Sequence, residues 1–512
     1  MSKVVKYAAS LMAVTILAKI VGFAREQVLS FAYGASTYTD IYVMAMNIPN
    51  VIFAAIGAAI STTFIPIYCE ISGNKGEKDA IKFTNNILTI VFILCIIIAF
   101  LGLVFTKPLL RVFAFGFRGE TLSIAIHFTR ILIFSIVFIG IANVLTAYLQ
   151  VKNNFTVPGL ISLPQNIIVI ISIFISMKYG PYAMVWGTLI GMSMQVLFQL
   201  PFAYKKGYKT KPYINLKDEN LKKMLVLTGP VLVGVTVHQV NTMIDRSIAS
   251  TLGEGSISAL NFADRLNSFV LALFITSIVA VIYPMFSKLS TSNNKKMLEQ
   301  YIVKSSNSII LLVMPVAVGA IILSTPIVKL LFERGAFEKT ATQMTSIALA
   351  MYSVGLVAYG LRDVINKVFY SLQDTKTPMV YGAIAMGLNI VFNIILSKFI
   401  GHAGLALGTS LSAIVCTILL YINLGKKIGN FGQIKIIKTS IKALTASIVM
   451  GIITKIGYDY MISILGNSLI NELASLSFSV LIGAIVYIVI IVMMKIEEVD
   501  MIIGLIKKEI KK

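Results

Sequence analysis

Two apolar stretches of similar build constrain this chain more than any other feature. Residues 40–68 read DIYVMAMNIPNVIFAAIGAAISTTFIPIY, and residues 258–286 read SALNFADRLNSFVLALFITSIVAVIYPMF. Each exceeds the roughly 20 residues that an α-helix needs to cross a bilayer. Pro66 in the first stretch and Pro284 in the second lie 218 positions apart. The two stretches are therefore candidates for equivalent parts of a repeat.

The same spacing recurs farther along the chain. TKPLLRVFAFG at 106–116 matches STPIVKLLFERG at 324–335, with one residue inserted before the glycine. Gly187-Thr188 matches Gly408-Thr409 at a spacing of 221. Ordered matches at a nearly constant spacing indicate an internal repeat. We therefore predict two copies of one structural unit.

The composition places both copies in a membrane. The 512 residues are 57% hydrophobic, with a mean hydropathy of +0.87, which is too apolar for a soluble fold. Apolar runs of 18 or more residues predict an all-α polytopic membrane protein. The net charge of +22 comes mostly from lysines in short loops, where it sets topology, so we expect no nucleic-acid partner. The three cysteines show neither metal-binding spacing nor a disulfide framework.

We predict about fourteen membrane spans, six in each copy and two after them. They lie near 7–33, 40–68, 83–106, 121–150, 157–178, 182–204, 223–251, 258–287, 302–324, 341–371, 378–398, 403–424, 436–458 and 473–495. Six is an even number, so the copies enter the membrane in the same direction as a parallel repeat. The predicted domains are an N-lobe at 1–205, a basic linker at 206–222, a C-lobe at 223–425, and an accessory helix pair with a basic tail at 426–512.

Loop charge predicts the orientation. The loops at 204–223 and 425–442 are rich in lysine, and a further lysine group follows residue 287. Positive loops mark the cytoplasmic side, where we also place both termini. The repeated segments at 107–120 and 325–339 lie on the opposite side, and each predicts a short amphipathic helix on the outer surface.

Ionised residues inside the spans are the first candidates for a functional site, because each costs roughly 2.5–3.5 kcal/mol at the bilayer centre. The first span holds Lys19, Arg25 and Glu26. Lys19 and Glu26 are seven residues apart and share a helix face, whereas Arg25 points elsewhere. The alternative is that Arg25 and Glu26 lie at the outer helix end and snorkel to water.

The second copy places charges in the equivalent spans. Asp245 and Arg246 lie in its first helix, and Asp264 and Arg265 in its second. A cavity between the two halves would then carry Lys19, Arg25 and Arg265, and arginine holds phosphate bidentately. The alternative is a structural ion pair between Asp245 and Arg246 or between Asp264 and Arg265.

A third group is neutral. Asn389 and Asn393 are four residues apart and share a helix face. Together with Asp245 and the hydroxyl of Thr409 they could supply oxygen ligands to a small cation such as Na⁺. The alternative is hydrogen bonding between helices, a common use of asparagine in membranes.

No motif in the chain points to catalysis. The three histidines are scattered, and Walker, HExxH and G-x-S-x-G motifs are absent. We therefore expect a transporter that is not an enzyme and not an ATP-driven pump.

Several short motifs resemble the MurJ (MviN) family of lipid II flippases, within the superfamily of multidrug exporters and polysaccharide flippases. They are AKIVGFARE at 18–26, IPN at 48–50, DRSIAS at 245–250, NFADRL at 261–266, FERGAF at 332–337 and SLQDTKTP at 371–378. FERGAF and the DTKTP loop are the more specific. The resemblance covers nearly the whole chain and implies fourteen helices, in two six-helix lobes plus a pair beside a groove for the lipid tail.

The resemblance implies that the chain moves undecaprenyl-diphosphate-linked peptidoglycan precursor from the inner to the outer leaflet of the bacterial cytoplasmic membrane. It assigns the substrate cavity to positions that match the family motifs. Arg25 and Arg265 match essential arginines, and Lys19 stands where the family commonly has arginine. Asp40 matches a functional acid, and Glu26 stands for a usual aspartate.

Asn50 belongs to the same implied set through the IPN motif, and Asp264 through NFADRL. Two positions depart from the family. A further cavity arginine often follows the second span's PN, where this chain has Val51-Ile52-Phe53. Members with a sodium site carry an acid where this chain has Asn393, so Na⁺ binding should be weaker or absent.

We interpret the chain as an alternating-access lipid II flippase with no cofactor beyond a possible coupling Na⁺. Its partners would be the lipid-linked substrate, membrane lipids and possibly other cell-wall synthesis proteins, and we expect a monomer. The alternatives are a flippase of another lipid-linked glycan or a cation-coupled drug exporter, which would want acidic cavity walls. A membrane glycan polymerase would need a loop carboxylate placed for general-base catalysis.

Overall fold

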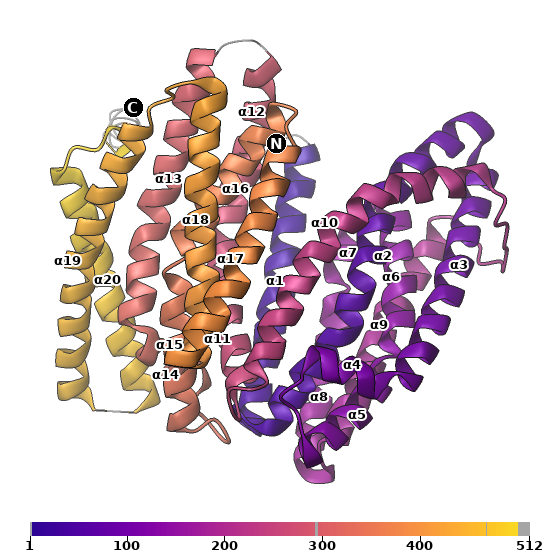
Figure 1. The fold of residues 1–512 in the computed structure, drawn as a ribbon, viewed down its shortest axis with the longest axis horizontal. Coiled ribbons are helices and arrows are strands. Elements are labelled where there is room, and N and C mark those ends of the chain that lie inside the picture. Colours follow the sequence, from indigo (N-terminus) through magenta and orange to yellow (C-terminus); the bar gives the residue numbers. More distant parts are fainter. Residues whose placement is uncertain (1–2, 292–294, 467, 500–512) are drawn as a thin grey trace. The chain divides into compact units, whose positions relative to one another are not determined.

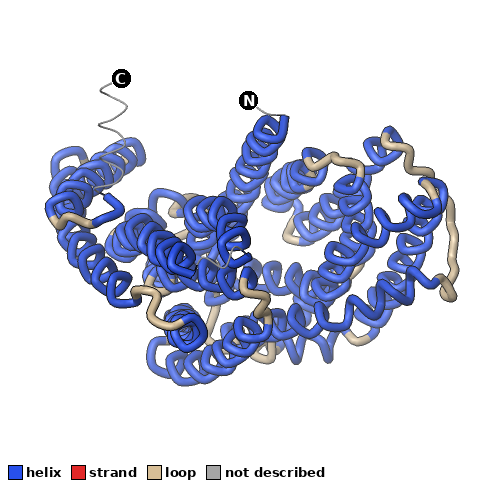
Figure 2. Tube along the Cα trace, turned by 90° about the horizontal axis from the view of Figure 1, so that it is seen from above, coloured by secondary structure: helices blue, strands red, loops and turns tan. Residues whose placement is uncertain are grey.

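The structure is a computed structural model that describes residues 3–291, 295–466 and 468–499 (Figure 1). Within these ranges every regular element is a helix, and short loops join the helices (Figure 2). Each of the fourteen predicted spans coincides with one helix or with consecutive helices. The predicted all-α membrane architecture is therefore confirmed. The chain forms two compact units, residues 1–258 with 334–337 and residues 259–333 with 338–512.

Unit 1 contains the first ten helices. They are α1 (Lys3–Tyr33), α2 (Thr37–Lys75), α3 (Glu77–Val104), α4 (Thr106–Phe113), α5 (Gly119–Leu132), α6 (Ser135–Val151), α7 (Thr156–Leu160), α8 (Ser162–Tyr179), α9 (Tyr182–Lys205) and α10 (Glu219–Ala249). The first residues of α11 (Ser256–Val270) belong to it as well. Long apolar helices with small residues at their contacts explain this bundle, because backbones can then approach closely.

Unit 2 contains the remaining helices. They are η1 (Leu271–Ile275), α12 (Thr276–Thr291), α13 (Lys295–Ile322), α14 (Ser324–Phe332), α15 (Lys339–Ser353), α16 (Leu356–Ser371), α17 (Lys376–Ile400), α18 (His402–Ile428), α19 (Gln433–Leu465) and α20 (Leu469–Met493). Its core gathers apolar side chains of α12, α13, α16 and α18, including Phe286, Ile309 and Phe369.

Ten described helical segments are long and apolar enough to span a membrane, or eleven when α15 and α16, bent by 40° at their junction, are counted as one span. The number fourteen stays a prediction. Several predicted spans are broken: 121–150 is split into α5 and α6, and 258–287 contains the π-helical turn η1. Hydropathy detects the span and cannot see such breaks, because the broken parts remain apolar.

The two predicted short helices are confirmed as α4 and α14. Each follows directly on a long helix, α3 or α13, and each buries apolar residues on one face. α4 buries Leu110 and Phe113, and α14 buries Val328 and Phe332. The equivalent elements of the two copies therefore fold alike.

The predicted basic linker is a strap fixed to α3. Asn85 donates from Nδ2 to the carbonyl of Lys209, and Asn86 exchanges two hydrogen bonds with Asn215, at 3.0 and 2.7 Å. Tyr208 donates from its hydroxyl to Asn85 Oδ1 at 2.9 Å. The strap then leads into α10, which packs along α2 in unit 1. The predicted lobe boundary at residue 223 remains a prediction, while the compact units divide after Ser258.

The C-terminal helices α19 and α20 pack side by side at one edge of unit 2 (Figure 1), and α19 also packs along α13. Lys329 of α14 forms an ion pair with the buried Glu472 at the start of α20. Asn307 of α13 donates to Glu498 at 2.6 Å beyond the end of α20. These polar contacts fix the pair to the repeat at both ends.

Candidate functional site

A buried charged cluster lies in unit 1, where α1 meets α8. The guanidinium of Arg25 donates from Nη2 to Glu26 Oε1 at 2.6 Å and from Nη1 to Asn166 Oδ1 at 3.1 Å. The side chain of Arg25 is 15% exposed and that of Glu26 5%. The alternative that both residues snorkel at an open helix end is therefore wrong for Glu26.

The expected directions of these side chains need one correction. Neighbours on a helix point about 100° apart, so Arg25 and Glu26 were expected to face different ways. The arginine side chain is long enough to reach around α1 to the carboxylate, and burial favours the pair over two separate charges. Lys19, farther back on α1, is exposed. The structure does not bring it to the cluster.

Asp40 occupies a different place, in the first turn of α2. Its carboxylate accepts hydrogen bonds from the backbone N–H of Gly255 at 2.8 Å and of Ser258 at 2.7 Å, and from the Ser258 hydroxyl at 2.6 Å. These donors lie at the N-terminus of α11, where a carboxylate is favoured. Glu254 returns the contact by accepting from Thr37 N–H at 2.9 Å. The two helix starts therefore cap each other.

Two glycine loops close on the same end of unit 1. A Cβ added to Gly116 would lie 2.1 Å from the carbonyl oxygen of Ser250, and one added to Gly335 would lie 2.4 Å from that of Phe31. Gly335 also has a φ of +61°, which favours glycine. Gly116 and Gly335 are 219 positions apart, and so are their respective partners Ser250 and Phe31, so the two contacts are equivalent in the repeat. The loop of each copy thus packs on the end of the other copy's first helix.

We call these contacts, made by Asp40, Glu254, Gly116 and Gly335, the cross-copy interlock. A further hydrogen bond runs from Ala336 N–H to the Phe31 carbonyl at 2.9 Å. Sequence analysis identified FERGAF and Asp40 as motifs but did not predict their contacts. The repeat spacing could have suggested one of them, because Asp40 and its partner Ser258 occupy equivalent positions of the two copies.

The remaining predicted cavity residues are divided between the two units. Asn50 is exposed on α2 and donates to the Met46 carbonyl of its own helix at 2.7 Å. Asp264 and Arg265 are exposed on the part of α11 that belongs to unit 2. A cavity shared by Lys19, Arg25 and Arg265 therefore stays a prediction.

The predicted neutral group does assemble within unit 2. Asn393 donates to Asn389 Oδ1 at 3.1 Å, and Asn389 donates to Thr409 Oγ1 at 3.2 Å. Both asparagines are buried. Asp245, the one carboxylate of the predicted set, belongs to unit 1. Within unit 2 the group is an amide–hydroxyl chain that ties α17 to α18.

Whether this group can bind a cation depends on the oxygen atoms that it offers as ligands. The three side chains supply only uncharged oxygens, and Asn389 Oδ1 already accepts a hydrogen bond from its neighbour. Among the described residues, no three His, Cys, Asp or Glu side chains gather as a metal-binding group. Within unit 2 the group thus offers uncharged oxygens, and Na⁺ binding stays a prediction.

Sequence reasoning missed two buried residues that form polar contacts between helices. Asn166 is a polar residue inside an apolar helix and accepts from Arg25. The hydroxyls of Tyr42 on α2 and Thr188 on α9 form a hydrogen bond of 2.7 Å, and both side chains are buried. An isolated polar residue in an apolar run is a usable signal. Its partner on another helix cannot be deduced from that signal.

Known proteins share both the sequence and the fold. The model of the family described as "Lipid II flippase MurJ" matches residues 29–462. The "Lipid II flippase MurJ" of Burkholderia cenocepacia is 30% identical over 427 residues, 81% of this chain and 82% of that protein. The "Probable lipid II flippase MurJ" of Vibrio cholerae is 31% identical over 430 residues, 80% of each.

Among solved structures, "Lipid II flippase MurJ, inward closed conformation" superposes with a TM-score of 0.79 at 27% identity, covering 94% of this chain and 97% of that one. An inward-facing multidrug transporter of the MATE family superposes with a TM-score of 0.70 at 16% identity, covering 83% of this chain and 99% of its own. The second likeness concerns the fold alone.

Proposed function

The chain belongs to the MurJ family of lipid II flippases, and from that membership we propose that it moves lipid II from the inner to the outer leaflet of a bacterial cytoplasmic membrane. The substrate would be undecaprenyl-diphosphate-linked peptidoglycan precursor. Flipping breaks no covalent bond, so the chain needs no catalytic residue. Both termini would lie in the cytoplasm, as the lysine-rich loops indicate.

The buried Arg25 is the observation that carries this proposal. Glu26 and Asn166 each take one guanidinium nitrogen, at 2.6 and 3.1 Å, and so hold the group in one orientation. A guanidinium has five N–H donors, so donors remain for the oxygens of a diphosphate. Ionisable residues inside membrane spans are costly and commonly mark substrate paths. Asp40, Asn50, Asp264 and Arg265 are proposed as further residues of the substrate path.

Alternating access would act through the cross-copy interlock. Opening that end of unit 1 must break the three hydrogen bonds to Asp40 and separate the glycine loops from the ends of α1 and α10. Each bond to the carboxylate contributes only about 1.5–3 kcal/mol net. The contact is therefore strong enough to close one end and weak enough to open during a transport cycle.

We also propose that any coupling Na⁺ binds weakly. Asn389, Asn393 and Thr409 would supply oxygens and Asp245 the only carboxylate of the set. Membrane potential would then supply most of the driving force, since moving one charge across 100 mV is worth about 2.3 kcal/mol.

Depletion and rescue in cells tests the flippase proposal. Cells lacking this chain should retain labelled lipid-linked precursor in the inner leaflet, and the wild type should restore its exposure outside. Arg25→Ala and Arg265→Ala should fail to restore it at normal membrane levels. Arg111→Ala, a control at an exposed position on α4, should rescue fully. Normal precursor exposure after depletion, in cells with no second flippase, would contradict lipid II as the substrate.

A further inference from the structure

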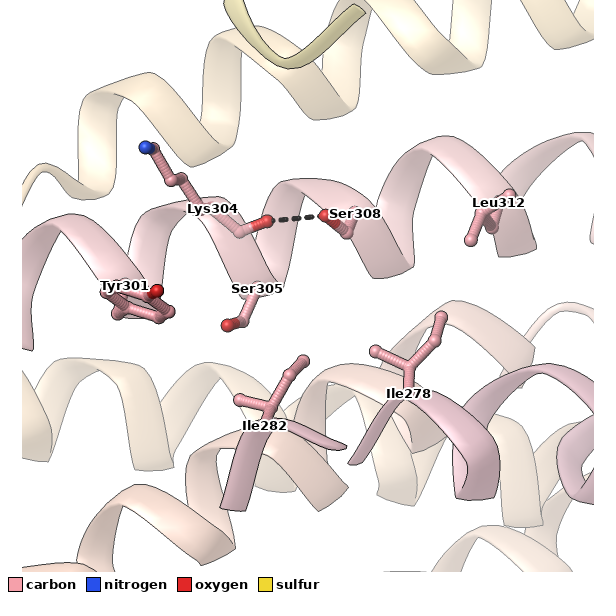
Figure 3. A pocket seen from close by; sticks show the side chains of 7 residues that line it. All are labelled: Ile278, Ile282, Tyr301, Lys304, Ser305, Ser308 and Leu312. Atoms are coloured by element: carbon pink, nitrogen blue, oxygen red, sulfur yellow. Dashed lines mark hydrogen bonds between the residues drawn. The ribbon is translucent and has the colours of Figure 1, made fainter. Parts of the chain in front are cut away.

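A cavity of about 530 Å³ lies between α12 and α13 of unit 2 (Figure 3). It is outside every cluster described above. Its lining residues are Ile278, Ile282, Tyr301, Lys304, Ser305, Ser308 and Leu312. A volume of this size is typical of pockets that bind small organic ligands.

The lining changes character along α13. Tyr301 and Ser305 stand near one end, Ser308 lies between them and Leu312, and the ammonium of Lys304 lies on the side of α13 away from the isoleucines (Figure 3). Leu312 closes the other end, and Ile278 and Ile282 of α12 face the cavity from the opposite wall. Ser308 donates to the Lys304 carbonyl at 2.8 Å, which leaves its lone pairs free to accept. The cavity therefore has polar residues and Lys304 toward one end and apolar residues on the opposite wall and at the other end.

The position of this gradient matches one membrane leaflet. α13 begins at Lys295, and Lys304 follows after about 14 Å of helix at 1.5 Å per residue. Leu312 lies about 12 Å deeper, close to the half-thickness of about 15 Å of the hydrocarbon core. Lys288, Lys295 and Lys296 are exposed near the same helix ends. A ligand here would have a head at the charged end and a chain inside the leaflet.

The positive charge of Lys304 determines which lipid headgroup can bind here. No acidic residue lines the cavity, and within the described ranges Lys304 forms no ion pair. A lysine at this depth snorkels and attracts anionic headgroups. We propose that this cavity, which we call the α12–α13 groove, binds an anionic phospholipid of the leaflet where α13 begins, with its phosphate at Lys304 and one acyl chain against Ile278, Ile282 and Leu312.

This proposal is independent of the flippase proposal, since it concerns a bilayer lipid and not the transported molecule. It can be tested on the purified full chain in mixed micelles. The chain has a single tryptophan, Trp186, so Trp186→Phe gives a silent background. Leu312→Trp then places a reporter at the deep end of the groove. Phosphatidylglycerol with brominated acyl chains should quench it at concentrations about fivefold lower than brominated phosphatidylcholine.

A matched reporter measures the bulk lipid shell. Val391→Trp lies at an exposed position on α17, fifteen residues from its start at 376, as Leu312 lies seventeen from the start of α13 at 295. It should be quenched equally by both lipids. Lys304→Gln should abolish the preference at the groove reporter, whereas Lys296→Gln, at an exposed position outside the cavity, should leave it intact.

Three results would overturn the proposal. One is equal quenching by both lipids at the groove reporter. Another is a preference that survives Lys304→Gln. The third is displacement of brominated phosphatidylglycerol by unlabelled undecaprenyl diphosphate at lower concentrations than by unlabelled phosphatidylglycerol, which would assign the groove to the prenyl substrate. None of these results depends on whether lipid II is flipped.

Discussion

The helix pair α8–α9 of unit 1 and the pair α17–α18 of unit 2 are equivalent parts of the two copies, and they pack through the same glycine. A Cβ on Gly187 would lie 2.0 Å from the Ser172 Cβ, and one on Gly408 would lie 2.3 Å from the Asn393 Oδ1. Both glycines and both partners are 221 positions apart. The glycine is common to both copies, and the side chain that packs against it differs. We call this contact at each glycine the glycine notch.

The threonine after each glycine extends the comparison. Thr188 and Thr409 each donate to the carbonyl four residues earlier, both at 2.8 Å. Each also meets a polar group of a neighbouring helix, Tyr42 at 2.7 Å in unit 1 and Asn389 at 3.2 Å in unit 2. The two copies therefore share their packing residues and differ in polar chemistry.

The charged residues near this packing differ as well. Unit 1 keeps a charged cluster beside this packing, built from Arg25, Glu26 and Asn166. In unit 2, α17 and α18 carry the neutral chain of Asn393, Asn389 and Thr409, while the charged residues of the second copy's first helix, Asp245 and Arg246, lie on α10 of unit 1. A repeat needs the same close helix approach twice, because that approach defines the fold.

The largest expected effect comes from breaking the charged cluster. Arg25→Ala leaves the carboxylate of Glu26 buried without its cation, which should cost about 3–5 kcal/mol of stability and reduce flipping at least tenfold. The double change Arg25→Ala with Glu26→Ala removes both charges. It should recover most of the stability, measured as melting temperature in detergent, and none of the flipping. Recovery of flipping in the double variant would contradict a role of Arg25 in substrate binding.

The glycine notches should differ in tolerance, and this sharpens the comparison. Gly187→Ala meets the stiff Cβ of Ser172, whereas Gly408→Ala meets the movable end of Asn393. Overpacking costs about 1–3 kcal/mol, and we expect Gly187→Ala at the upper end and Gly408→Ala at the lower. Adding Ser172→Gly should restore the stability of Gly187→Ala and not that of Gly408→Ala. Adding Asn393→Ala should restore the stability of Gly408→Ala and not that of Gly187→Ala. Equal costs, or relief across copies, would show that the two notches do not pack as described.

Much of the fold could be predicted because it follows from features that act along the chain. Apolar length gave the spans, and the spacing between Gly187 and Gly408 gave the repeat. The breaks at Ile133–Phe134 and at η1 were not predictable, since their residues are as apolar as the helices around them.

The candidate site was predictable as residue types and not as partners. Helix periodicity states which face a side chain occupies, so Asn389 and Asn393 were correctly placed together. It cannot state which helix lies opposite, so Asn166 and Tyr42 were missed. It also misled at Arg25, because a long flexible side chain is not confined to the direction of its Cβ.

The threonines should give a smaller and symmetric effect. Thr188→Val removes the hydroxyl that meets Tyr42, and Thr409→Val removes the one that meets Asn389. Each change leaves a buried polar group short of a partner, at about 1–3 kcal/mol. Because the geometry is shared, the two melting temperatures should fall by similar amounts. A drop in one copy alone would mean that the equivalent threonines are not used alike.

The smallest expected effect concerns Na⁺, where unit 2 would have to act through its neutral amides. Replacing Na⁺ by choline should change flipping by the wild type less than about twofold, because Asn389, Asn393 and Thr409 offer no charge to the ion. Asn393→Asp adds a carboxylate at a buried position 3.1 Å from Asn389, and that charge should make Na⁺ binding favourable. Flipping by Asn393→Asp, assayed in vesicles of fixed membrane potential, should then depend several-fold on Na⁺. Ser172→Asp at the equivalent position of unit 1 is the matched control, since Ile168 stands there in place of Asn389, and it should gain no Na⁺ dependence. A strong Na⁺ dependence of the wild type would instead place a carboxylate beside the amides, with Asp245 as the first residue to replace.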